Sequence, residues 1–204
     1  MFPIELTSVL TGASLGQLQR WRTEGLLPPE GSERPVRYSF RDVVALRTMM
    51  KLRTELSFQK VRRAFNNLPV YQFTQHPAEY RFGTDGKSIA VLDEEQWMDL
   101  TRNPGQYDLF TMAQVFQGYT TKSGREVVDF TKPRKNLRVN GALMGGWPTI
   151  IGTRVGYDTV ASLVEDGSLT ATDVHHFYPT VPIEAVADAV ELAAMVSAIR
   201  STAA

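Results

Sequence analysis

Few side chains in this sequence have the types and spacing that catalysis or metal binding requires. The chain has no cysteine and 3 histidines, which excludes thiolate metal sites, disulfides and cysteine nucleophiles. His175 and His176 are neighbours on an expected helix and point about 100° apart, which disfavours a shared metal ion. His76 precedes a proline, and we expect it in a loop.

A run of carboxylates is the other candidate for acid–base or metal chemistry. Its members are Asp93, Glu94, Glu95 and Asp99. Adjacent acids on a turn point in different directions, and no histidine lies close in the sequence to complete a site. A solvated polar loop is the interpretation we favour. We therefore expect no catalytic residue, no metal and no cofactor, in a protein that is not an enzyme.

The glycine-rich stretch GALMGGWPTIIGTRV, residues 141–155, raises the possibility of a phosphate-binding loop. No lysine follows its glycines as a Walker loop requires, and Gly145, Gly146 and Gly152 do not have the spacing of a dinucleotide fingerprint. The apolar pair at 150–151 and the following TRV indicate a short hairpin or extended arm that packs on helices. We expect Arg154 to be a buried or half-buried anchor for a carboxylate or a helix C-terminus.

Charge divides the chain into two unequal parts. Residues 1–67 contain 11 basic and 6 acidic side chains, whereas residues 68–204 contain the other 11 basic side chains and 16 acidic ones. This asymmetry favours a polyanion as the partner of the first part. No apolar run approaches the length of a membrane span, so we expect a cytoplasmic protein without a membrane partner.

The segment LTSVLTGASLGQLQRWRTEGLLPPE predicts two short helices joined by a tight turn at Gly12. Ser14 is a good N-cap for the second helix, whose apolar face includes Trp21, and Gly25 with the two prolines that follow ends it. Polar and basic side chains occupy its remaining faces, as in a helix that reads the major groove.

The basic segment that follows predicts a wing and two more helices. Residues 31–38 indicate a short two-stranded wing with basic side chains for phosphates, and Ser39 caps a helix over 40–56, followed by another from 58 to 68. A solvated helix face is expected to carry Arg47, Arg53, Arg62 and Arg63. The DNA-contact candidates are Ser14, Gln17, Gln19, Arg20, Arg22, Arg34, Arg37 and Tyr38.

Residues 4–67 resemble the winged-helix DNA-binding domain of the MerR family. The motifs TGASLGQLQRW, EGLLPP, RPVRYSFRDVVAL and LSFQKVRRAF stand in the order and spacing of that family. The resemblance implies that the corner at 25–28 ends the recognition helix and that Arg37 and Tyr38 lie where the wing returns. The family commonly carries an arginine at the place of Gln19, so Arg20 is the candidate that replaces its phosphate contact.

The middle region, residues 68–130, is predicted as a small α+β unit for dimerisation or partner docking. Asp85-Gly86 between alternating apolar residues is a hairpin signal. A polar loop is expected around DEEQWMDLTRNPGQ, then a short helix in LFTMAQVFQGY. The stretch TTKSGREVVDFTKPRKNLRVN follows as an extended, basic strand and linker.

Residues 131–204 are predicted as the glycine-rich arm followed by three helices, 157–165, 171–177 and 183–200, in a homeodomain-like arrangement. Thr170 caps the second helix, on which Val174 and Phe177 are expected to face inward. From 139 to 204 there are only 2 basic side chains and 7 acidic ones. Such a unit is a poor ligand for DNA and suits a basic protein or self-association.

The stretch GGWPTIIGTRV…VASLVEDGSLTATDVHHFYPTVPIEAVADAVELA resembles the small domain of unknown function found in VapB-type antitoxins. The resemblance covers about 55 residues of the sequence and implies a PIN-domain ribonuclease toxin as partner. The candidates for structural or partner-binding roles are Gly145, Gly146, Trp147, Pro148, Gly152, Thr153, Arg154, Tyr178 and Pro179.

Together these features predict a mainly α fold with small β elements: a winged helix-turn-helix at 1–67, an α+β region at 68–130 and a three-helix unit at 131–204. The predicted function is that of an antitoxin that binds operator DNA as a homodimer and neutralises its toxin. The alternative is a stand-alone MerR-like regulator whose later part senses a small molecule or serves dimerisation.

Overall fold

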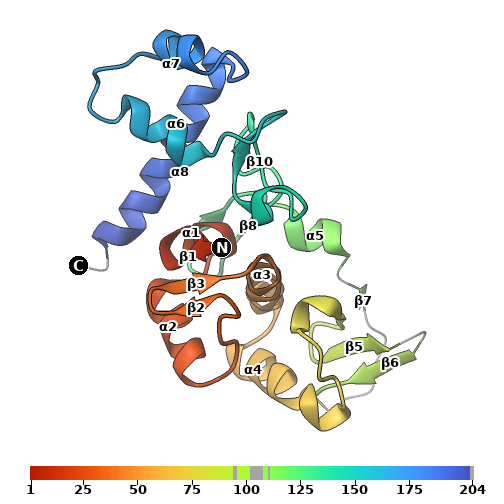
Figure 1. Cartoon of the computed structure of the whole chain (residues 1–204). Coiled ribbons are helices and arrows are strands. Elements are labelled where there is room, and N and C mark those ends of the chain that lie inside the picture. Colours follow the sequence, from red (N-terminus) through yellow and green to blue (C-terminus); the bar gives the residue numbers. More distant parts are fainter. Residues whose placement is uncertain (94–95, 102–107, 110, 203–204) are drawn as a thin grey trace.

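The computed structural model covers the whole chain and describes residues 1–93, 96–101, 108–109 and 111–202 (Figure 1). As predicted, the fold is mainly helical with small antiparallel sheets. Among the described residues, no helix is both long enough and apolar enough to cross a bilayer.

The N-terminal part is a winged helix-turn-helix. Its elements are β1 (Phe2–Pro3), α1 (Ile4–Thr11), α2 (Leu15–Thr23), β2 (Ser32–Glu33), β3 (Val36–Tyr38), α3 (Phe40–Glu55) and α4 (Phe58–Asn67). The wing hairpin gains a third strand, because β1 pairs with β3 to give the order β1-β3-β2. Both predicted caps are present: Ser14 accepts from the Gln17 amide at 3.2 Å, and Ser39 accepts from the Asp42 amide at 3.0 Å.

The packing of α2 confirms the expected core position of Trp21. Its side chain is buried and stacks on Phe58 of α4, with 5.4 Å between ring centroids. Arg53 lies over the same rings, 5.1 Å from the centroid of Phe58, and is half-buried. Arg53, predicted on a solvated face, is therefore only partly solvated, because its guanidinium covers an aromatic pair.

A four-stranded sheet forms the middle region, with order β6-β5-β4-β7. Its elements are η1 (Pro69–Tyr71), η2 (Pro77–Glu79), β4 (Arg81–Thr84), β5 (Ile89–Asp93), β6 (Gln96–Asp99) and β7 (Asp108–Leu109). The predicted hairpin is confirmed: β4 pairs with β5, and the Asp85 carboxylate accepts from the amides of Lys87 and Ser88. Stacking of Phe65 on Phe82, with centroids 5.1 Å apart, joins the sheet to α4.

The prediction of a polar loop from residue 93 onward was wrong for its first part. Residues 96–99 form β6, whose Trp97 lies opposite Leu92 of β5. The pairing with a buried neighbouring strand outweighed the polar composition of the segment. Of the acidic run, Glu94 and Glu95 lie outside the described residues.

The chain then returns to the N-terminal domain. The predicted helix is α5 (Met112–Phe116), and the stretch expected as an extended linker begins with a hairpin, β8 (Tyr119–Thr120) and β9 (Glu126–Val127). The Tyr119 hydroxyl donates to the carbonyl of Thr11 at 2.6 Å, which places this hairpin on the helix-turn-helix.

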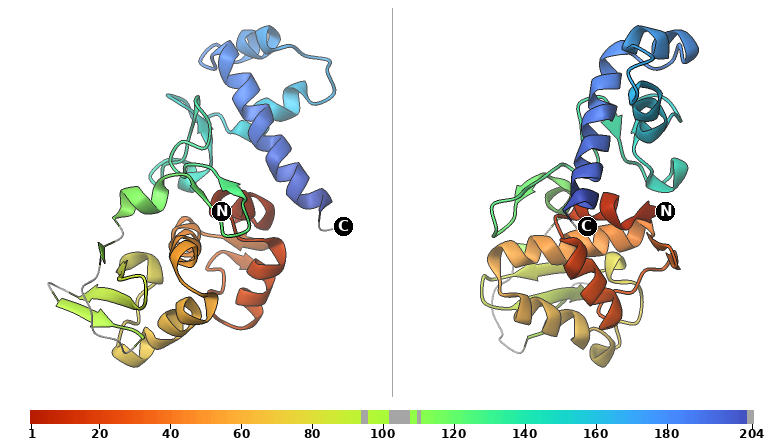
Figure 2. Two further views of the ribbon diagram at one scale, coloured as in Figure 1. Left: turned by 180° about the vertical axis from the view of Figure 1, so that it is seen from behind. Right: turned by 90° about the vertical axis from the view of Figure 1, so that its left-hand side faces the viewer.

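The C-terminal part consists of a small hairpin and three helices that pack on one another. Its elements are β10 (Leu137–Arg138), η3 (Met144–Gly146), β11 (Thr149–Ile150), α6 (Tyr157–Val164), α7 (Ala171–Phe177) and α8 (Ile183–Ser201). The helix bounds agree with the prediction to within one residue. α8 also reaches α1 (Figure 2). There the Arg200 guanidinium lies 3.7 Å from the Glu5 carboxylate.

One inward position in α7 was predicted wrongly. Val174 is buried, but Phe177 is 61% exposed. The chain turns away directly after Phe177, and Val181 fills the inner position instead. His175 fixes this turn, with its Nδ1 2.7 Å from the Val181 carbonyl.

Candidate DNA-binding surface

The recognition helix α2 presents polar side chains outward. Gln19 and Arg20 are exposed, and Arg22 is half-buried. Ser14 and Gln17 are held in a reciprocal capping box, in which the Gln17 side chain accepts from the Ser14 amide at 2.9 Å. Gln19 and Arg20 therefore offer the side chains with the most freedom to reach a base edge or a phosphate.

The wing places only some of its predicted contacts on the surface. Arg34 is exposed and Arg37 is half-buried, whereas Tyr38 is buried. Successive side chains of a strand point to opposite faces, so Tyr38 on β3 faces the core when Arg37 faces outward. Burial raises the pKa of Tyr38 to about 12. The prediction of Tyr38 as a DNA contact was therefore wrong.

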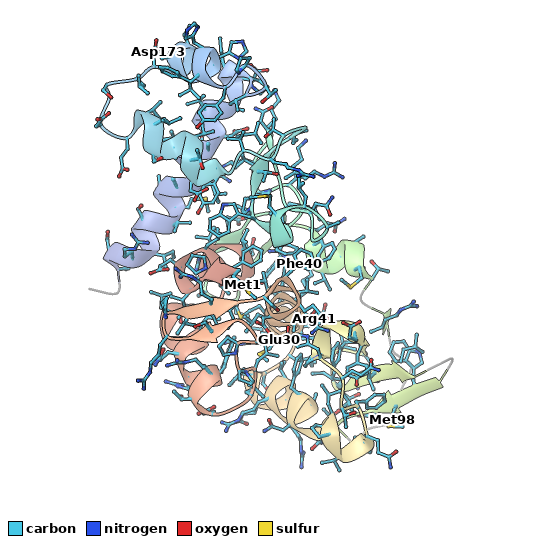
Figure 3. All side chains as sticks on the ribbon, in the orientation of Figure 1. Met1, Glu30, Phe40, Arg41, Met98 and Asp173 are labelled. Atoms are coloured by element: carbon cyan, nitrogen blue, oxygen red, sulfur yellow. The ribbon has the colours of Figure 1, made fainter. Side chains whose placement is uncertain are left out.

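A buried carboxylate connects the wing to α3 and to the middle region. Asp42 is fully buried and accepts from the amides of Ser39 at 2.7 Å and Glu30 at 3.0 Å. Its second oxygen lies 3.1 Å from Nε2 of His76, so this histidine is part of the network, not a plain loop residue. Arg41 extends the network at the surface through an ion pair of 2.7 Å with Glu30 (Figure 3).

Glu30, Asp42 and His76 have the proximity of a metal site, but their hydrogen bonds do not suit one. Nδ1 of His76 accepts from the amide of Ala78 at 3.2 Å, so Nε2 carries the ring proton and donates to Asp42. That nitrogen therefore has no lone pair directed at an ion. The cluster holds the wing in place.

Arg47 has a structural role that the sequence interpretation missed. It is fully buried in α3, so its placement on a solvated face was wrong. Its guanidinium donates to main-chain carbonyls of Leu10, Val115, Phe116, Gln117 and Val128, with distances of 2.6 to 3.0 Å for the last four. Burial lowers its pKa to about 10, so the group stays charged at neutral pH. The sequence signal that could have indicated its burial is its position inside the mostly apolar stretch VVALRTMM, all of which is buried in α3.

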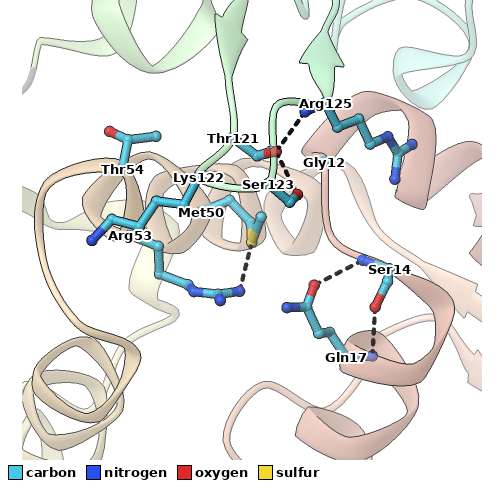
Figure 4. A pocket seen from close by; sticks show the side chains of 10 residues that line it. All are labelled: Gly12, Ser14, Gln17, Met50, Arg53, Thr54, Thr121, Lys122, Ser123 and Arg125. Carbon is cyan, nitrogen blue, oxygen red and sulfur yellow. Dashed lines mark hydrogen bonds between the residues drawn. The ribbon is translucent and has the colours of Figure 1, made fainter.

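The hairpin of β8 and β9 is attached to the turn of the helix-turn-helix. Arg125 donates to the Ser8 carbonyl at 3.0 Å, and Lys122 donates to the Leu56 carbonyl at 3.0 Å. Gly12, with φ of +74°, lies so close that a Cβ there would be 2.5 Å from a methyl carbon of Val127. Between the hairpin, the start of α2 and the end of α3 lies a cavity of about 460 Å³ (Figure 4).

The glycine-rich stretch joins the N-terminal and C-terminal parts. Trp147 packs on Phe2 and on Tyr157, with centroid distances of 6.2 Å and 5.8 Å, and its indole donates to Asp158 at 2.9 Å. Gly146 lies against the ring of Phe40. Its contacts are those of a packing segment, as predicted for an arm on helices.

The remaining candidates of this region differ in exposure. Pro148 is buried and its carbonyl accepts from the Tyr157 amide at 3.0 Å, while Thr153 closes the turn around Gly152 through the Ile150 carbonyl at 3.0 Å. Arg154 is exposed, so its prediction as a buried anchor was wrong: the turn directs its side chain outward. At the end of α7, Tyr178 is half-buried and Pro179 is exposed.

Comparison with known families gives two matches. Residues 2–68 match the family described as MerR HTH family regulatory protein. Residues 138–193 match the family described as protein of unknown function (DUF433). No curated protein and no solved structure matches the chain. The chain therefore carries, at its N-terminus, the MerR-type helix-turn-helix of a DNA-binding transcription regulator and, at its C-terminus, a DUF433 domain.

Proposed function

We propose that this protein is an antitoxin that represses its own operon through the MerR-type domain and neutralises a PIN-domain ribonuclease through the DUF433 domain. The observation that carries the DNA-binding half is the exposure of Gln19 and Arg20 on α2 together with Arg34 on the wing. A homodimer would present two such surfaces to the two half-sites of a palindromic operator.

Removing one basic group from α2 and one from the wing should weaken DNA binding in a salt-dependent way. For Arg20→Ala combined with Arg37→Ala, we expect the log–log slope of affinity against salt to fall by about one unit per lost phosphate contact. The measurement is a fluorescence anisotropy titration at several salt concentrations. A duplex of about 30 base pairs, roughly three helical turns, serves as the probe.

Arg138→Ala is the matched control, because Arg138 is exposed on β10 and lies outside the helix-turn-helix. It should leave the slope unchanged. An unchanged slope in the double variant would remove Arg20 and Arg37 from the interface. Failure of the unaltered protein to bind duplex DNA at low salt would overturn the DNA-binding half of the proposal.

The antitoxin half is supported by the surface of the DUF433 domain. Phe177 and Ile183 are 61% and 46% exposed at the turn between α7 and α8. Exposed carboxylates surround the same three helices, among them Glu165, Asp166 and Glu184. An exposed aromatic side chain on a domain with exposed carboxylates suits a basic protein partner, and the resemblance to VapB-type antitoxins favours a PIN-domain toxin.

The partner can be identified with a tagged pull-down from the native host, followed by mass spectrometry. We expect a PIN-domain ribonuclease in the eluate. We expect Phe177→Ala to weaken the binding of this ribonuclease by about 2 kcal/mol, roughly 30-fold in Kd. Val70→Ala is the control, because Val70 is 73% exposed but lies in the middle region. Two results together would contradict the antitoxin function and support a stand-alone regulator: the pull-down contains no PIN-domain protein, and a small molecule raises the melting temperature.

A further inference from the structure

The cavity beside the recognition helix has a distinct chemical character. Its walls come from three segments that are distant in sequence: the start of α2 with Ser14, the end of α3 with Arg53, and the turn of the β8–β9 hairpin with Lys122, Ser123 and Arg125 (Figure 4). Three of these side chains are cationic, and no carboxylate is among the residues that line the cavity.

The three cations are held by neutral groups, which do not neutralise their charge. Lys122 donates to a main-chain carbonyl of Leu56, and Arg125 donates to Ser8. Arg53 rests on the rings of Trp21 and Phe58. Within the described part of the chain, none of the three forms an ion pair, whereas the carboxylates of Glu24 and Glu30 pair with other arginines. Held cations without a carboxylate favour an anionic ligand.

The place of the cavity indicates which anion it meets. It borders Ser14 and Gln17 at the beginning of α2, less than two helical turns from the exposed Gln19 and Arg20. B-DNA presents a phosphate about every 3.4 Å of axis on each strand. The hairpin turn lines the same cavity as the first residues of α2, so a duplex bound along α2 would bring its closely spaced phosphates toward that turn.

We propose that the β8–β9 hairpin acts as an additional wing, which binds a DNA backbone phosphate at the cavity lined by Arg53, Lys122 and Arg125. This inference rests on the proposed DNA-binding function and extends its interface into the segment between the two matched families. The wing at 32–38 and the turn at 121–125 then contact the same duplex from different elements. Because phosphates are contacted, the hairpin adds affinity and not sequence preference.

Loss of the hairpin's exposed cation should be visible in the salt dependence. For Lys122→Gln, we expect the log–log slope for the mixed-sequence duplex to fall by about 0.9, the value for one lost phosphate contact. Lys132→Gln is the matched control, because Lys132 is exposed beyond the hairpin and does not line the cavity. It should leave the slope unchanged.

A second measurement does not depend on the Lys122 contact with α3. Because the chain has no cysteine, Ser123→Cys can be labelled at a single site with an iron chelate that cleaves nearby DNA. Ser123 is exposed at the hairpin turn, and Thr180→Cys, exposed on the DUF433 domain, is the control label. We expect strand cleavage from position 123 and none from position 180.

The possible results separate this inference from the proposed function. If the unaltered protein binds the duplex but Lys122→Gln keeps the full slope and the label at 123 does not cleave, the hairpin is not part of the interface and only this inference fails. If the unaltered protein does not bind the duplex at all, the DNA-binding function fails and this inference fails with it.

Discussion

Arg47→Met should destabilise the protein by about 3–5 kcal/mol, the range for removing one partner from a buried charged network. The variant side chain fills much of the same volume but donates no hydrogen bond. Carbonyls of α1, of α5, of the residue after α5 and of the segment after β9 each lose one hydrogen bond. Among them, the Phe116 carbonyl keeps a second donor, the amide of Phe130 at 2.7 Å. Each buried carbonyl left without a partner adds to the cost. Denaturant unfolding at neutral pH measures the difference in the free energy of unfolding.

Arg53→Met is the matched control, because the same substitution two turns along α3 removes a guanidinium that stacks on rings and has no main-chain acceptor among the described residues. We expect a loss below about 1.5 kcal/mol there. Equal losses at the two positions would show that the carbonyl contacts of Arg47 contribute little.

The pH dependence of the Arg47 effect follows from its pKa, which burial lowers to about 10. Between this value and the higher pKa of an arginine in the unfolded chain, the unfolded chain binds more protons than the folded one, so this group makes stability rise with pH only there. Below pH 9 the group is charged in both states. The difference between the unaltered protein and Arg47→Met should therefore be constant from about pH 6 to pH 9.

Gly146→Ala should be the second large loss, about 2–5 kcal/mol. Gly146 has φ of +83°, where an alanine costs about 1–2 kcal/mol. Its Cβ would also lie 2.4 Å from Cδ2 of Phe40 and 3.2 Å from Cζ of Phe2. Overpacking of this kind adds about 1–3 kcal/mol. The expected result is a lower free energy of unfolding in a denaturant titration.

Gly145→Ala separates the two causes. Gly145 has φ of +62°, but a Cβ there would meet nothing within 4 Å. It should therefore show the backbone cost alone, about 1–2 kcal/mol. If both glycine variants lose the same stability, the close approach to Phe40 is not important, and the packing of the glycine-rich stretch on α3 is weaker than the distances indicate.

Local signals in the sequence were sufficient for the helices and for the turns between them. The caps Ser14, Ser39 and Thr170 each satisfy an amide three residues ahead in the chain. Asp85 does the same within its hairpin. Such interactions involve only neighbours in the sequence, so they are readable from the sequence alone.

Predictions of exposure were less successful, because exposure depends on segments far along the chain. Arg47 is buried by carbonyls up to 81 residues away, and β6 exists because β5 lies beside it. Tyr38 was predicted on the surface of a two-stranded wing, but the pairing of β1 with β3 and its inward face made it part of the core. The apolar spacing within one segment carries no information about partners that come from other segments.

By itself, the sequence determined a winged helix-turn-helix with polar and basic side chains on its recognition helix, a short α+β region and an acidic three-helix unit. Only the tertiary structure decided how these parts are joined: the hairpin at 119–127 rests on Gly12, Trp147 lies between Phe2 and Tyr157, and α8 reaches α1. The physical reason is that local hydrogen bonds and apolar spacing specify an element, whereas the burial of one element by another depends on the whole chain.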